Sequence, residues 1–63
     1  MEIPVSVVRV RSEFLEMPGL QLTLPQAARL LGLDPRDCRD AVDVLVRSEF
    51  LRWTPRGTIA RAA

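Results

Sequence analysis

The sequence has no histidine, no tyrosine and a single cysteine, Cys38, in 63 residues. One cysteine cannot close an internal disulfide, and a chain without histidine lacks the side chain that most often binds zinc or moves protons near neutral pH. None of its three glycines belongs to a glycine-rich phosphate loop. These absences predict that the protein is not an enzyme and holds neither a metal nor a cofactor.

Long apolar runs are also absent, since none reaches the ~20 residues that cross a bilayer. The second residue, Glu2, is acidic, and no basic segment precedes a long apolar one, which argues against a signal peptide. We therefore expect a cytoplasmic protein with no membrane partner, in a compartment that keeps Cys38 reduced.

Length and composition favour one folded domain, which we place over residues 1–63. The apolar fraction of 48% and the charged fraction of 27% are ordinary for a globular protein. A chain of this size buries only ~60% of the surface that its unfolded form exposes. We therefore expect low stability, or stability raised by association of chains.

The middle of the chain has the pattern of two short helices joined by a tight turn. Thr23 and Gln26 match a capping box, in which each side chain bonds an amide at the helix start. Gly32 supplies the left-handed residue that ends the first helix, and Asp34 caps the second, Pro35–Arg47. One apolar face is predicted to run along both helices, made of Leu24, Ala27, Ala28, Leu30, Leu31, Cys38, Ala41, Val42 and Leu45.

Further elements are predicted on both sides of this pair. Residues 5–17 form a helix, because Val7, Val10, Phe14 and Met17 recur at helical spacing before Pro18. Residues 20–22 can form a short strand. Residues 50–54 and 58–61 are predicted as two strands joined by a turn at residues 55–57.

Two helices with a tight turn, followed by a hairpin, resemble the winged helix-turn-helix domain of bacterial transcription regulators, over nearly the whole chain from residue 7 to residue 61. The resemblance implies a mainly α fold with three helices and a two- to three-stranded wing. It also implies that Pro35–Arg47 lies near the major groove of double-stranded DNA. The residues placed to contact DNA are Arg36, Arg39, Arg52, Trp53 and Arg56.

Glu49 departs from the family pattern, which usually has glycine at the turn before the wing. A residue with a side chain at a left-handed position costs roughly 1 kcal/mol. Either this strain is accepted, or the preceding helix ends in a different way.

The charge is unevenly distributed, although the net charge is only +1. Residues 1–33 are neutral overall, residues 34–49 carry a net charge of −2, and residues 50–63 contain three arginines and no acidic residue. The positive charge therefore lies on the predicted wing and not on the predicted recognition helix.

The predicted recognition helix carries Asp37, Asp40 and Asp43 at intervals of three. Such carboxylates can serve as acid–base groups or bind magnesium. The better interpretation is a solvated face of i,i+4 ion pairs, each worth ~0.2–0.5 kcal/mol, formed by Arg36–Asp40, Arg39–Asp43 and Asp43–Arg47. Three acids on this surface would also repel DNA phosphates at close range.

Two functions therefore stay open. The first is a small DNA-binding protein or transcription regulator whose contacts are led by the basic wing. The second is an adaptor that binds another protein through the same fold, because an aromatic flanked by arginines is also typical of protein interfaces. Trp53 can serve either function, or it can simply pack over the sheet.

A homodimer is predicted through the first helix. Val8 and Leu15 flank Arg11 and are left over once the other apolar residues of this helix have packed inward. A symmetric partner would cover both side chains, with Arg11 beside Glu13 or Glu16 of the other chain. The alternative is that this strip packs within one chain.

Cys38 shares the buried phase of its helix. We expect an inert, structural thiol, since a redox sensor requires an exposed thiolate near positive charge.

Overall fold

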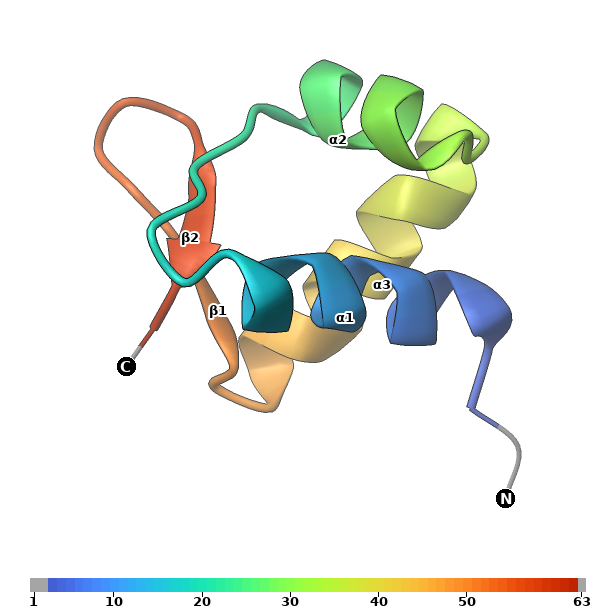
Figure 1. Cartoon of the computed structure of the whole chain (residues 1–63), viewed down its shortest axis with the longest axis horizontal. Coiled ribbons are helices and arrows are strands. Elements are labelled where there is room, and N and C mark those ends of the chain that lie inside the picture. The colour runs from blue at the N-terminus through green and yellow to red at the C-terminus, as the bar shows by residue number, and fades with distance from the viewer. Residues whose placement is uncertain (1–2, 63) are drawn as a thin grey trace.

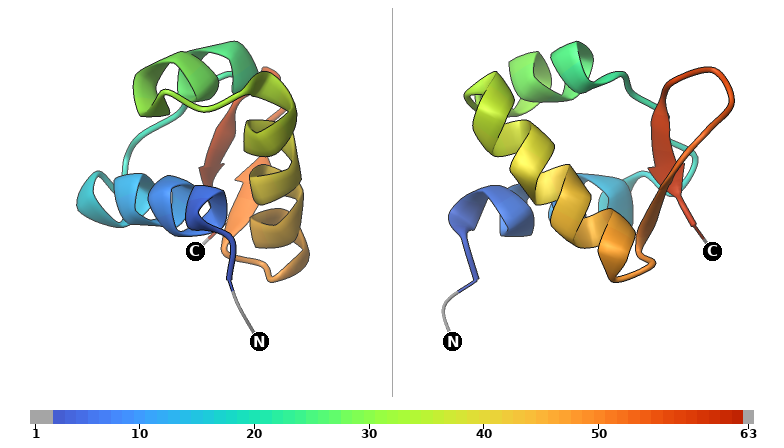
Figure 2. Two further views of the ribbon diagram at one scale, coloured as in Figure 1. Left: turned by 90° about the vertical axis from the view of Figure 1, so that its right-hand side faces the viewer. Right: turned by 180° about the vertical axis from the view of Figure 1, so that it is seen from behind.

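Three helices precede a two-stranded antiparallel hairpin in the computed structural model, which describes residues 3–62. The elements, in order, are α1 (Val5–Glu16), α2 (Leu24–Leu31), α3 (Pro35–Arg47), β1 (Leu51–Trp53) and β2 (Ile59–Arg61). Helix α3 packs against both other helices and against β1 (Figures 1 and 2). The predicted fold class, mainly α with a small hairpin, is confirmed, and the layout is compatible with a winged helix-turn-helix.

Helix α1 buries one face against the rest of the chain. Its buried residues have the predicted helical spacing: Val7, Val10 and Phe14. The predicted place of Met17 on this face was wrong, because Met17 is 43% exposed. The helix ends at Glu16, since Met17 precedes Pro18 and the proline ring disfavours helical backbone in the residue before it.

The start and end of α2 follow the sequence prediction. The Thr23 amide donates to Gln26 Oε1 over 2.9 Å, and the Gln26 amide donates to the Thr23 hydroxyl over 3.2 Å. Gly32 ends the helix in the left-handed region, with φ 66° and ψ 33°. Leu30 was wrongly placed on the buried face and is 54% exposed. At 3.6 residues per turn it points about 110° away from the centre of that face.

Helix α3 also begins as predicted. Asp34 Oδ1 accepts a hydrogen bond of 2.8 Å from the Arg36 amide, and Pro35 is the first helical residue. The buried stripe of α3 is confirmed at all four positions, Cys38, Ala41, Val42 and Leu45.

At the end of α3 the chain turns into the wing through a left-handed residue. Glu49 has φ 65° and is the only residue other than glycine with positive φ in the part of the chain that the structure describes. The Phe50 amide donates to the Leu45 carbonyl over 2.9 Å, which closes the end of the helix. Of the two alternatives that the sequence allowed, the structure has the accepted strain.

The hairpin is short and tightly turned. Leu51 lies opposite Arg61 in the register of the two strands. In the turn, the Thr54 amide donates to the Thr58 carbonyl over 2.8 Å, and Gly57 takes φ 80°. The paired strands are shorter than predicted, because residues 54 and 58 belong to the turn. They comprise Leu51–Trp53 and Ile59–Arg61.

The predicted strand at residues 20–22 is only a single bridge. Leu22 and Ile59 exchange two backbone hydrogen bonds of 3.1 and 2.6 Å. The Leu20 amide instead donates to the Met17 carbonyl over 2.9 Å, so the chain is still turning there. The bridge holds the connection between α1 and α2 against the outer edge of β2.

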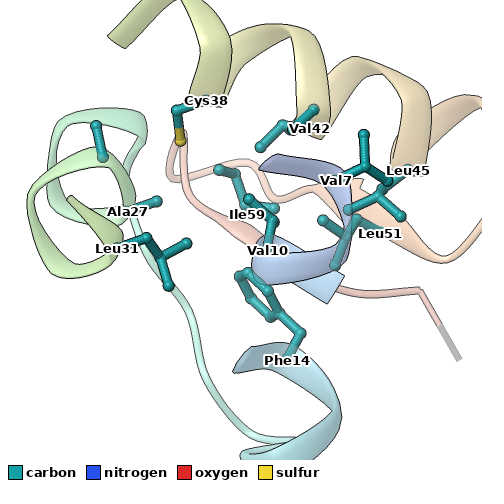
Figure 3. Close-up of a cluster of buried hydrophobic side chains, with 12 residues drawn as sticks. Val7, Val10, Phe14, Ala27, Leu31, Cys38, Val42, Leu45, Leu51 and Ile59 are labelled. Carbon is teal, nitrogen blue, oxygen red and sulfur yellow. The ribbon is translucent and has the colours of Figure 1, made fainter. Parts of the chain in front are cut away.

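The core is one cluster to which all three helices and both strands contribute. The side chains of Val10, Phe14 and Ile59 point toward the same interior (Figure 3). All three are fully buried. This interior fixes the position of the hairpin relative to the helices, because β1 and β2 each contribute one member, Leu51 and Ile59.

Candidate nucleic-acid interface

The solvent-exposed cations of the hairpin are Arg52, on β1, and Arg56, in the turn. Arg61, the third arginine of the basic segment, is half-buried. Its guanidinium carbon lies 4.7 Å from the centroid of the Phe50 ring, within cation–π distance. Arg61 therefore packs on the chain itself, and the outer positive charge of the wing comes from the other two arginines.

Arg52 and Arg56 line one open pocket of about 340 Å³. Thr54 and Pro55 of the turn also line the pocket on the hairpin side. Gln21 lines it from the connection between α1 and α2. Among the described residues, no acidic side chain lines this pocket. The structure thus brings together two of the predicted contact residues in surroundings that suit an anion.

Sequence reasoning missed Gln21. The alternation of Leu20, Gln21 and Leu22 was a signal that the glutamine points away from the core. Nothing in the local pattern places it beside the hairpin, since that contact depends on the bridge between Leu22 and Ile59.

Trp53 is 42% exposed at the outer end of β1. Strand alternation puts its side chain on the same face as that of Leu51, which is 1% exposed. The ring is therefore partly covered and partly available to a partner. Trp53 does not line the pocket between Arg52 and Arg56.

The outer surface of α3 carries charges of both signs. Arg36, Arg39, Asp37 and Asp40 are all exposed, and Asp43 is half-buried. The i,i+4 ion pairs predicted on this face stay a prediction. The cations and anions are nevertheless interleaved on one helix face, which weakens the attraction of this face for phosphate.

The two groups of predicted contact residues lie on different parts of the molecule. The first turns of α3, with Arg36 and Arg39, lie beside α2 at one end of the longest dimension, which measures 30 Å (Figure 1). The hairpin turn, with Arg56, lies at the other end. The structure therefore does not gather all the predicted residues into one cluster.

A second, apolar groove of about 350 Å³ lies along the junction of α1 and α3. It contains Val8 and Arg11 of the predicted dimer interface, with Val8 49% exposed. Leu15 is 44% exposed but lies outside the groove. Sequence reasoning missed Val44, which lines the groove from α3 and is 47% exposed.

Arg11 also has an intramolecular contact that the sequence did not reveal. Its guanidinium carbon lies 5.1 Å from the centroid of the Phe50 ring. Phe50 thus receives two arginines, Arg11 from α1 and Arg61 from β2, and links the first helix to the wing.

Cys38 is fully buried in the core, as its helical phase predicted. Burial raises the pKa of the Cys38 thiol, because the apolar surroundings disfavour the thiolate. The protonated thiol is a poor nucleophile, which agrees with a structural role.

Among the described residues, no helix has the length and apolar character needed to cross a membrane. Comparison of the chain with models of protein families, with curated proteins and with solved structures gives no match.

Proposed function

We propose that this protein binds double-stranded DNA as a small winged helix-turn-helix protein, with contacts led by the wing, and that it acts as a transcription regulator. The observation that carries the proposal is the pocket of the hairpin, which the exposed Arg52 and Arg56 line without an acidic residue among its other lining residues. Guanidinium groups suit phosphate because their planar donors can bond two oxygens at once.

The recognition helix has a secondary role in this proposal. Arg36 and Arg39 can reach phosphate or guanine when α3 lies near the major groove. The exposed Asp37 and Asp40 on the same face are repelled by the backbone. Affinity is therefore expected to be modest and strongly dependent on salt.

The test is fluorescence anisotropy of a labelled duplex at low and at high salt. Arg56→Glu and Arg39→Glu form a matched pair, since each replaces an exposed arginine by glutamate. We expect Arg56→Glu to weaken binding by about tenfold or more, roughly 1.4 kcal/mol, and Arg39→Glu to have the smaller effect. If Arg39→Glu abolishes binding while Arg56→Glu binds like the wild type, the helix and not the wing leads the contact. Absence of duplex binding by the wild type at low salt would overturn the proposal.

The apolar groove between α1 and α3 favours a second candidate function, that of an adaptor that binds another protein without DNA. The same groove also suits a second copy of this chain, and a homodimer is compatible with either function. Along helix α1, Arg9 and Arg11 precede Glu13 and Glu16. Two antiparallel α1 helices related by a two-fold axis would therefore place opposite charges side by side.

A further inference from the structure

We propose that Gln21, Arg52 and Arg56 form a seat for one backbone phosphate of double-stranded DNA, and that Gln21 is a binding residue of the wing although it belongs to the connection between α1 and α2. The proposal rests on the proposed function and names the group that the wing recognises. It depends on the direction of the hydrogen bonds around the hairpin turn.

Gln21 is held in place by contacts with the hairpin. The paired backbone hydrogen bonds between Leu22 and Ile59 hold the neighbouring Gln21 at the outer edge of β2. The Thr58 hydroxyl then donates to Gln21 Oε1 over 3.2 Å. The glutamine is thus fixed at its backbone and at its side chain, on the rim of the pocket.

The number of hydroxyl hydrogens determines which threonine of the turn is the donor. Thr58 has one hydroxyl hydrogen and gives it to Gln21, so Thr54 is the donor in the 2.6 Å contact between the two threonine hydroxyls. The Thr54 oxygen in turn accepts the amides of Arg56 and Thr58, each over 3.3 Å. Both threonine hydroxyl hydrogens are therefore used, that of Thr54 by Thr58 and that of Thr58 by Gln21.

These hydrogen bonds determine which donor groups remain available in the pocket. Since Gln21 Oε1 is occupied as an acceptor, its Nε2 group remains as a pair of N–H donors. The guanidinium groups of Arg52 and Arg56 are donors only. The three longest side chains that line the pocket thus offer donors, and two of them carry positive charge.

Three side chains with donor groups line this pocket from two segments of the chain, and such a set suits a tetrahedral anion. A phosphate has oxygens pointing in several directions, so it can accept from three side chains, whereas a carboxylate offers two oxygens in one plane. The pocket is open to solvent, so a phosphate that remains part of a duplex can enter it. A phosphate held there would also join the helix-turn-helix to the wing, because Gln21 lies two residues before the Thr23 cap of α2.

The test compares Gln21→Glu with Gln26→Glu. Both exposed glutamines gain one negative charge, but Gln26 lies on α2 outside the pocket, and glutamate preserves the capping box that Gln26 forms. Gln21→Glu keeps the acceptor for Thr58 and loses the amide donor. We expect Gln21→Glu to bind a labelled duplex about tenfold more weakly than Gln26→Glu at low salt, a difference of roughly 1.4 kcal/mol.

A neutral variant separates a direct contact from a general charge effect. Gln21→Met should weaken duplex binding without changing the slope of log Kd against log salt, because no counterion-releasing charge is lost. Arg52→Gln should lower that slope by about one unit, as expected for one phosphate contact. Circular dichroism and urea unfolding of each variant check that the fold is retained.

The same variants separate this proposal from the proposed function. If the wild type binds the duplex and Gln21→Glu binds as tightly as Gln26→Glu, the seat is wrong while wing-led DNA binding stands. If the wild type does not bind the duplex, NMR titration with inorganic phosphate at constant ionic strength becomes decisive. Phosphate-dependent shifts of the Gln21 side-chain amide in the wild type would then support a phosphate seat, and the absence of such shifts would overturn it. If poly-glutamate displaced the labelled duplex as well as unlabelled duplex does, the assignment to phosphate would also be overturned.

Discussion

At Glu49 the backbone occupies a region that side chains disfavour, with φ 65°. This residue ends α3 and sets the direction in which the chain enters the wing. Replacement by glycine removes the clash between Cβ and the backbone, so Glu49→Gly should raise the free energy of unfolding by up to about 1 kcal/mol. Urea unfolding monitored by circular dichroism measures the change.

The matched control is Ser48→Gly at the preceding residue, whose φ of −83° needs no glycine. This change also removes the hydrogen bond of 3.0 Å from the serine hydroxyl to the Leu45 carbonyl. Ser48→Gly should therefore lower stability. Loss of stability in both variants would show that Glu49 is not strained.

Cys38 gives the protein a pH dependence that few other groups can obscure. The sequence contains no lysine and no tyrosine, and arginine does not titrate below about pH 12. Burial raises the pKa of the Cys38 thiol above its ordinary value of 9.0 in the folded chain. At pH values between the pKa of the thiol in the unfolded chain and its pKa in the folded chain, the native chain keeps a proton that the unfolded chain has lost.

The free energy of unfolding should therefore be insensitive to the thiol below about pH 8 and should fall as the pH rises past 9. Cys38→Val should keep the fold and remove this alkaline loss. Cys38→Asp should unfold the domain, because it buries a carboxylate without a partner. Urea unfolding at a series of pH values checks the trend, and rapid reaction of the native protein with a thiol reagent would contradict the buried state.

On the scale of elements, α2 depends on its cap more than the other helices do. It has only 8 residues, and an isolated helix of that length is not stable in water. The capping box satisfies two amides at its first turn. Thr23→Ala should therefore lower the free energy of unfolding by about 1 kcal/mol, whereas Thr23→Ser, which keeps the hydroxyl acceptor, should be close to wild type. Equal stability of the two variants would show that tertiary packing alone holds α2.

The hairpin, unlike α2, is held in position by contacts with segments that are distant in the sequence. Ile59 is bonded to Leu22 on one side and pairs with Trp53 on the other. Phe50 at the base of the hairpin lies within cation–π distance of Arg11 and Arg61. The wing is thus attached to both the start and the middle of the chain, which keeps its arginines at a fixed place relative to the helices.

On the scale of the whole molecule, a dimer interface would cover a large share of the surface of so small a chain. A stable interface buries ~800 Å² per partner, roughly a fifth of the 4485 Å² that this chain exposes. The exposed apolar side chains around α1 are available for it: Ile3, Val5, Val8, Leu15 and Val44. A two-fold dimer through this surface would also present two copies of the proposed DNA-binding wing to paired half-sites.

Sedimentation at roughly tens of micromolar should therefore show a dimer of this 7.1 kDa chain. Leu15→Glu should shift it to the monomer, because a charge at the interface must be desolvated without a partner. Leu30→Glu is the matched control, since Leu30 is similarly exposed but lies on α2. A monomeric wild type, unchanged by either substitution, would rule out the dimer.

The sequence by itself determined the parts of this protein that depend on residues close together in the chain. The caps of α2 and α3 and the left-handed Gly32 were predictable, because each involves hydrogen bonds or dihedral preferences within a few residues. Helical spacing likewise predicted the buried stripe of α3. The concentration of positive charge in the last 14 residues was also visible in the sequence alone.

Only the tertiary structure decided which of these charges can act together. Gln21 joins the arginines of the wing through Thr58, 37 residues later, and Arg61 turns inward onto Phe50. The exposure of Leu30 and Val44 depends on which side of each helix the core covers. The physical reason is that local hydrogen bonds and spacing fix the elements, whereas a site built from separate segments forms only when the shared core has packed them together.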